Sequence, residues 1–263
     1  MFRRFYFKNK NYWQVLKCCE IVSEDKPASL TRKQLVDACL EVLFEKYEAK
    51  QLSFSLFGIN GTPKGKGVGL KRFNNILAKH GYEPYSVFVD SKGDIPNVKL
   101  EFHIDSVKRS VHPEKDFHLI EFTWCNRDAD HRLNLDKVCE SLLKTWNFDY
   151  AYARNLPYYF SPIQGSEYKV GFGMVEGKID RTMFQWTDHA YETLDGKIKD
   201  FYPYNLLSYK QKERLAAATD LTPEPFGQNH YKATWTYEQI EALKQKHQSL
   251  TIVNQKTFKN LTN

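Results

Sequence analysis

The sequence contains few cysteines, and their arrangement excludes two common ways of stabilising a fold. There are five in 263 residues. Their number is odd and no C-x-x-C spacing occurs, so neither a disulfide framework nor a zinc ribbon is indicated. Cys39 and Cys139 fall on the apolar faces of predicted helices, where a buried thiol behaves as a small hydrophobic side chain. We expect all five to be reduced and structural: Cys18, Cys19, Cys39, Cys125 and Cys139.

Long apolar runs are also missing. The first eight residues carry positive charge, but no apolar segment follows them, so they predict a strand rather than a signal peptide. No later run approaches the roughly 20 apolar residues that a membrane-spanning helix needs. We therefore expect a soluble, cytoplasmic protein without a membrane partner.

Recognisable catalytic and metal-binding signatures are absent as well. The sequence has no Gly-x-Ser-x-Gly elbow and no His-Glu-x-x-His pair. Two groups of acidic and histidine residues could be considered as metal sites. The first precedes a predicted helix, and we expect its Asp130 to act as the N-cap of that helix. The second alternates along a predicted strand, a pattern typical of a solvent-exposed face. We expect no catalytic residue, metal or cofactor, although a triad assembled from distant residues stays open. The residues of these two groups whose side chains could ligate a metal are Asp128, Asp130, His131, Glu101, His103 and Asp105.

A glycine-rich stretch, residues 61–69, lies between a predicted strand and a predicted helix, where a phosphate-binding loop would lie. A P-loop needs four residues between its first glycine and the Gly-Lys pair, followed by Ser or Thr. Here three residues separate Gly61 from Gly65, and Gly67 follows Lys66. A surface loop is favoured over a nucleotide site.

Abundant aromatic and apolar residues, by contrast, predict a substantial core. Helical periodicity marks a helix capped by Thr31, with Gln34 three residues on. A first strand is predicted over residues 2–8 and a short helix over residues 12–19. Further strands are expected at residues 52–57, 85–89, 98–104, 117–124, 148–153 and 169–175, and further helices at residues 70–80, 133–146, 209–218 and 236–247.

The order of these elements favours an α+β fold, with one mainly antiparallel sheet flanked by helices. We expect residues 1–263 to form a single domain whose polar tail after residue 250 is mobile. Periodicity does not decide between a helix and a strand pair for residues 181–194.

Positive charge is concentrated in one stretch. The net charge is +6, and residues 58–79 contain five basic and no acidic residues. Such a cluster can bind phosphates or an acidic protein surface, or form a solvated helix face. Aromatic residues gather around Arg154 and Pro157. Among them, Tyr150 and Tyr152 suit the buried face of a strand, whereas Tyr158 and Tyr159 suit a binding surface.

Two segments carry a resemblance to a known family. Residues 133–155 contain a helix followed by Trp146-Asn147-Phe148-Asp149-Tyr150-Ala151-Tyr152, and residues 201–207 read Phe-Tyr-Pro-Tyr-Asn-Leu-Leu. Both stretches resemble bacterial polymorphic-toxin immunity proteins of the immunity protein 52 group. The resemblance implies an α+β protein that binds and blocks a cognate toxin by surface complementarity, without chemistry of its own.

The leading hypothesis is therefore an immunity or inhibitor protein that occludes a toxin or effector. Its basic charge favours a partner with an acidic surface. The alternative is a nucleic-acid-associated protein of a phage or mobile element, which would use the same residues. The residues expected to reach the partner are Lys64, Lys66, Lys71, Arg72, Tyr158 and Tyr159.

Overall fold

The computed structural model describes residues 12–57, 67–80, 86–92, 98–103, 116–126, 134–157, 166–171, 174–179, 186 and 189–253. Its strands are β1 (Tyr12–Val22), β2 (Leu52–Phe57), β3 (Ser86–Ser91), β4 (Val98–His103), β5 (Asp116–Asn126), β6 (Tyr150–Pro157), β7 (Ser166–Gly171), β8 (Met174–Ile179), β9 (Tyr204–Ser208), β10 (Glu224–Phe226) and β11 (His230–Thr234). Its α-helices are α2 (Arg32–Phe44), α3 (Leu70–His80), α4 (Leu135–Leu143), α6 (Tyr209–Ala218) and α7 (Tyr237–Lys246). Short 3₁₀ helices are η1 (Ala49–Gln51), η3 (Ala190–Thr193) and η4 (Gln248–Leu250).

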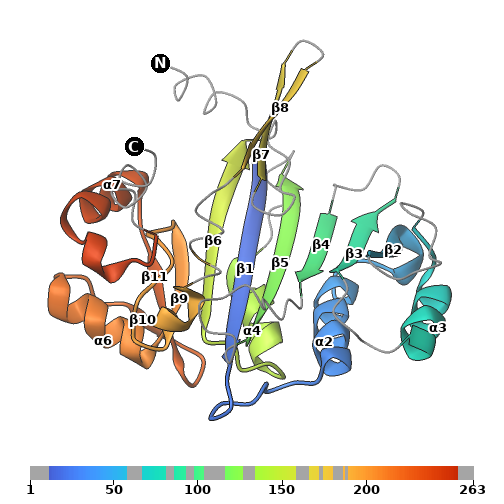
Figure 1. Ribbon diagram of the computed structural model, residues 1–263, viewed down its shortest axis with the longest axis horizontal. Helices are drawn as coiled ribbons and strands as arrows, with labels where there is room; N and C mark the ends of the chain where they lie inside the picture. The colour runs from blue at the N-terminus through green and yellow to red at the C-terminus, as the bar shows by residue number, and fades with distance from the viewer. Residues whose placement is uncertain are drawn as a thin grey trace.

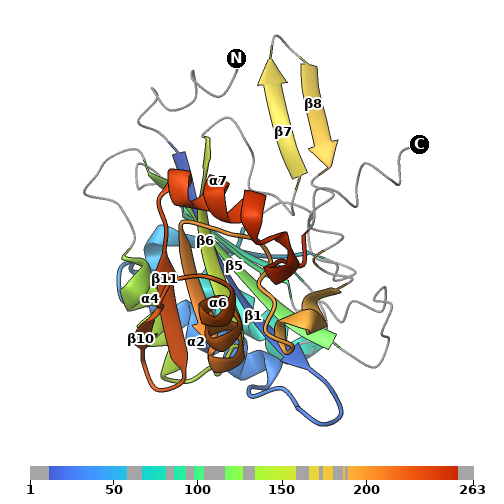
Figure 2. The same cartoon turned by 90° about the vertical axis from the view of Figure 1, so that its left-hand side faces the viewer.

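Nine strands form one sheet in the order β10-β11-β9-β6-β1-β5-β4-β3-β2, and all neighbouring strands are antiparallel. Helices α6 and α7 lie toward the β10 end of the sheet, and α2 and α3 toward the β2 end (Figure 1). The remaining two strands, β7 and β8, form a separate hairpin that projects from the rest of the molecule (Figure 2). The predicted α+β class, with an antiparallel sheet flanked by helices, is confirmed.

Two cores cover the two faces of this sheet. Successive side chains of a strand point to opposite faces. In β1, Leu16 and Cys18 join one core with residues of α2, α3 and α4. Cys19 and Ile21 join the other with residues of α6 and α7. The sheet includes strands from both ends of the described chain; that residues 1–263 form a single domain stays a prediction.

The sequence prediction is wrong at the central strand of the sheet. Residues 12–19 belong to β1, which pairs with β5 and β6, and are not a short helix. The strand is buried on both faces, so its apolar residues run without the alternation that marks a half-exposed strand. The strand predicted at residues 2–8 lies outside the described residues.

Local signals at helix ends were more reliable. Thr31 accepts a hydrogen bond from the Gln34 amide and completes the predicted capping box of α2. Helix α4 is capped by Asn134 rather than by Asp130, which lies outside the described residues. The helices predicted at residues 209–218 and 236–247 are confirmed as α6 and α7. Strands β9, β10 and β11 were not predicted. The single strand expected at residues 169–175 is wrong, because these residues fall across the paired strands β7 and β8.

The C-terminal region is ordered further than expected. The sequence placed the start of a polar tail after residue 250, but Ile252 and Val253 are buried. Their amides donate hydrogen bonds to the carbonyls of Ile198 and Lys199, at 2.8 and 3.0 Å. Apolar burial explains the correction, because Ile252 and Val253 belong to the same core as Ile240 and Leu243 of α7. Residues 254–263 lie outside the described part.

Among the cysteines whose side chains the structure describes, Cys18, Cys19, Cys39 and Cys139 are free thiols, and these four are buried. Burial raises the pKa of the Cys18, Cys19 and Cys39 thiols, which makes each a weaker nucleophile at neutral pH. Cys125 lies on β5. Within the described ranges, no helix is both long enough and apolar enough to cross a membrane.

Candidate functional site

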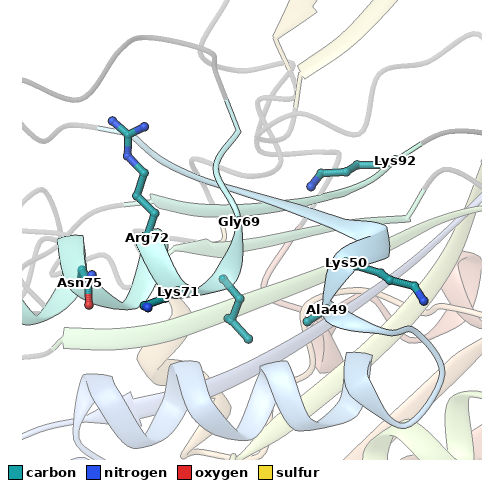
Figure 3. Close-up of a pocket in the computed structure, with 8 residues that line it drawn as sticks. Ala49, Lys50, Gly69, Lys71, Arg72, Asn75 and Lys92 are labelled. Atoms are coloured by element: carbon teal, nitrogen blue, oxygen red, sulfur yellow. The ribbon is translucent and has the colours of Figure 1, made fainter.

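A hollow of about 550 Å³ lies near the β2 end of the sheet, and basic side chains surround it (Figure 3). We call it the basic hollow. Four of its eight lining residues are cationic, and none of the eight is acidic or aromatic. Its lining residues are Ala49, Lys50, Gly69, Leu70, Lys71, Arg72, Asn75 and Lys92.

Three separate segments bring these residues together. Lys50 lies in η1, just before β2, and Lys92 directly follows β3. Because β2 and β3 are antiparallel neighbours, the start of one lies beside the end of the other. The Lys92 amide fixes this arrangement by donating a 2.8 Å hydrogen bond to the Gln51 carbonyl.

The third segment is the first turn of α3. The chain leading into α3 is held to β2 by two backbone hydrogen bonds between Phe54 and Val68, of 2.9 and 2.7 Å. Gly67 permits this close approach, because a Cβ there would lie 1.6 Å from the Ser53 hydroxyl oxygen. Helix α3 is then anchored in the core by Phe73 and Leu77.

The electrostatics of the hollow are uniformly positive along α3. The first turn of α3 contains no acidic residue, whereas it carries Lys71 and Arg72, both exposed. These cations lie at the positive end of the helix dipole, where an anion is favoured and a cation is not. Their positive potentials therefore add.

The two remaining cations differ in how they face the hollow. Figure 3 shows the side chain of Lys92 extending toward the start of α3 and that of Lys50 extending away from it. The Lys50 ammonium also lies 2.6 Å from Glu48, whose hydrogen bond raises the pKa of Lys50. An exposed pair of this kind contributes little energy, so Lys50 can exchange Glu48 for another anion.

The structure describes only part of the predicted binding set. Lys71 and Arg72 line the hollow. Lys64, Lys66, Tyr158 and Tyr159 lie outside the described residues, so their roles stay predictions.

Sequence reasoning missed Lys50 and Lys92. Each is an isolated basic residue at the end of a predicted strand. The pairing of β2 with β3, which brings them together, could have been inferred only by assuming that adjacent strand signals form neighbouring strands.

The acidic groups weighed as metal ligands gain no support. Glu101 and His103 do alternate along β4, as predicted, whereas Asp105, Asp128, Asp130 and His131 lie outside the described residues. In the part of the chain that the structure describes, no three His, Cys, Asp or Glu residues are grouped to hold a metal ion.

The two segments on which the predicted resemblance rests, residues 133–155 and 201–207, meet inside the fold, and none of their residues is among the described residues that line the basic hollow. The Tyr150 hydroxyl donates a 3.1 Å hydrogen bond to the Asn205 side-chain oxygen, and the Asn205 amide donates to the Tyr202 carbonyl at 2.7 Å. The rings of Tyr152 and Tyr202 stack with centroids 4.4 Å apart. Tyr150 and Tyr152 are buried, which confirms core packing for this pair.

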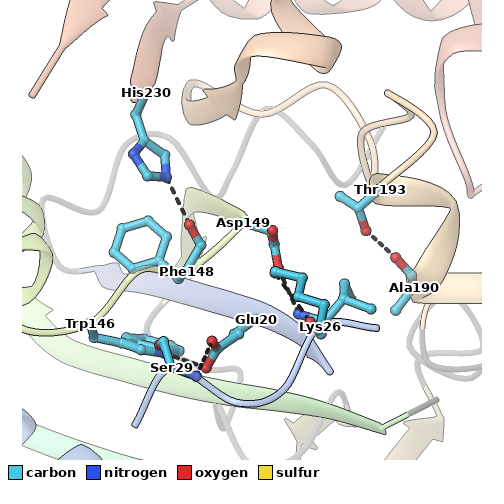
Figure 4. Close-up of polar contacts among 10 residues, drawn as sticks. Glu20, Lys26, Ser29, Trp146, Phe148, Asp149, Ala190, Thr193 and His230 are labelled. Carbon is cyan, nitrogen blue, oxygen red and sulfur yellow. Dashed lines mark hydrogen bonds and ion pairs between the residues drawn. The ribbon is translucent and has the colours of Figure 1, made fainter. Parts of the chain in front are cut away.

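The Trp146 and Asp149 positions of the same motif fix the end of β1 (Figure 4). The Trp146 indole donates a 2.8 Å hydrogen bond to the buried Glu20 carboxylate. Asp149 accepts a 2.7 Å hydrogen bond from the Ile21 amide and pairs with Lys26. The motif residues therefore build the framework of the protein rather than its binding surface.

No family model matches the chain. No curated protein matches it either. Among solved structures, it is similar to the T6SS protein PA0821 of Pseudomonas aeruginosa, with a TM-score of 0.47 and 13% sequence identity over 83% of this chain. The chain spans 64% of the length of that protein.

A buried histidine links the motif segment to β11. The His230 side chain lies within 2.8 Å of the Phe148 carbonyl (Figure 4), which can only accept, so Nε2 carries the proton. Desolvation lowers the pKa of His230 from its ordinary value of 6.5. As pH falls, the imidazole therefore takes up its second proton at a higher pH in the unfolded chain than in the folded chain.

We expect this histidine to weaken the fold in acid. As pH falls through and below about 6.5, protonation stabilises the unfolded chain first, so the free energy of unfolding decreases. In His230→Gln the same decrease should be smaller. Urea unfolding of both proteins at about pH 7.5 and about pH 5.5 measures this difference, and an equal pH dependence in the two proteins would contradict the assignment.

Proposed function

We propose that this chain is an immunity or inhibitor protein. It binds an acidic surface of a toxin or effector and thereby occludes that partner. The observation that carries the proposal is the basic hollow, which is lined by cationic residues of three separate segments. Electrostatic complementarity of this kind selects partners and accelerates their association.

The rest of the protein supports this role as a rigid framework. The motif residues Trp146, Asp149 and Tyr150 are engaged in internal hydrogen bonds that join β1, β6 and β9. A preorganised scaffold binds with a smaller loss of conformational entropy than a flexible one. Four buried free thiols suit a reducing compartment, and we place the protein in the cytoplasm.

Co-purification tests the proposal. The tagged protein is co-expressed with an inactivated product of the adjacent gene, in the native host, and the captured material is analysed for stoichiometry. We expect an equimolar complex whose association rate falls steeply between about 0.05 and about 0.5 M NaCl, because salt screens charge steering.

Two other outcomes contradict the proposal. Capture of nothing under these conditions would overturn it. Capture of nucleic acid in place of protein, with a steep salt dependence of binding to mixed oligonucleotides, would establish the nucleic-acid alternative.

A further inference from the structure

The basic hollow is not lined by charge alone. Ala49 and Leu70, both half-buried, contribute apolar surface between the cations. Leu70 packs with one part of its side chain against the core and also lines the hollow. At Gly69 an added Cβ would meet no atom of the described residues within 4 Å, so these residues leave open space beside the apolar surface. The hollow thus combines an apolar floor with a cationic rim.

This combination distinguishes between anionic ligands. A small inorganic anion such as phosphate would pair with the cations but would leave the apolar floor in contact with water. A nucleic-acid strand would gain most from stacking on aromatic side chains, and none of the described residues that line the hollow is aromatic. A ligand that supplies both an apolar group and several negative charges would use the whole surface.

Resting on the function proposed above, we propose that the basic hollow binds an acidic segment of the partner protein in which carboxylates flank one leucine- or phenylalanine-sized side chain. The apolar side chain covers Leu70 and Ala49. The flanking carboxylates pair with Lys71, Arg72 and Lys92. The volume of about 550 Å³ lies within the range of roughly 300–1,000 Å³ typical of ligand pockets.

Two capped pentapeptides test this assignment on the isolated protein. Both carry two acidic residues on each side of the centre, and the central residue is leucine in one and serine in the other. Isothermal titration at about 0.05 M NaCl gives their affinities. We expect the leucine peptide to bind about ten-fold more tightly, because only it buries apolar surface on the floor.

A matched pair of variants locates the effect. Leu70 and Leu135 are each the first residue of a helix, and each is partly buried against the same core. We expect Leu70→Ser to reduce the ten-fold preference to about two-fold, and Leu135→Ser to preserve it. Circular dichroism verifies that both variants are folded, and the comparison of the two peptides on the wild-type protein needs no variant.

Several results would overturn the inference: equal affinity for the two peptides, displacement of the leucine peptide by equimolar inorganic phosphate, or loss of the preference in Leu135→Ser. Its failure is distinct from failure of the proposed function. An equimolar protein complex without peptide discrimination removes only this inference. Peptide discrimination without a protein complex removes the inhibitor function and leaves the acidic-segment site.

Discussion

Replacing Lys17 with methionine is expected to lower the free energy of unfolding by about 3–5 kcal/mol, one of the two largest effects that we predict. Lys17 lies in the central strand, is only 2% exposed, and pairs with the buried carboxylate of Glu121 on β5. In the variant the Glu121 carboxylate stays buried but loses the Lys17 ammonium as its partner. Urea unfolding followed by tryptophan fluorescence measures the loss.

Two controls separate pairing from side-chain size. Lys33→Met removes a lysine of an exposed i,i+4 pair with Asp37, and should change stability by less than about 0.5 kcal/mol. The double variant Lys17→Met/Glu121→Leu should recover part of the loss, since it removes both buried charges. A loss below about 1 kcal/mol for Lys17→Met alone would show that the carboxylate is compensated by other groups.

The second large effect is expected on partner binding. The double variant Lys71→Glu/Arg72→Glu should slow association of the complex about a hundred-fold at low salt, because it reverses the charge along one side of the basic hollow. Its fold should be retained, since both side chains are exposed and acidic residues are favoured in the first turn of a helix. Stopped-flow or surface-based kinetics measure the rate.

A control variant with the same change in net charge, but outside the hollow, shows whether the effect is specific to the hollow. Lys144→Glu/Lys246→Glu alters two exposed lysines next to α4 and at the end of α7, neither of which lines the hollow. It changes the net charge by the same amount and should slow association less than about five-fold. Similar slowing in both double variants would mean that overall charge, and not the hollow, steers the partner.

Helix α2 and strand β2 could be predicted because one face of each meets water, which gives their sequences a periodic pattern. The capping box of Thr31 and Gln34 located the start of α2 correctly. The alternation of apolar and polar residues over positions 52–57 located β2. Strand β1 could not be recognised, because its neighbours on both sides and the helices on both faces bury it. Burial removes the periodic contrast on which such predictions depend.

The binding site was predictable only where its residues are adjacent in sequence. Lys71 and Arg72 belong to a visible basic stretch, whereas Lys50 and Lys92 join them through the pairing of β2 with β3. The polar residues Lys17 and Glu121 gave no signal either. Each is a single charge within an apolar strand, and only the register of β1 against β5 brings them together.

The position of β1 in the sheet also determines when the protein can fold during its synthesis. Leu16, near the beginning of the chain, pairs with Phe122 on one side and Ala153 on the other. A ribosome must therefore synthesise all residues between β1 and β5 before this strand can acquire its first neighbour, and all residues up to β6 before it can acquire the second. Until then, a largely apolar strand is exposed to other nascent chains, so the interval between the synthesis of β1 and that of β5 is the stage at which this protein most needs protection from aggregation.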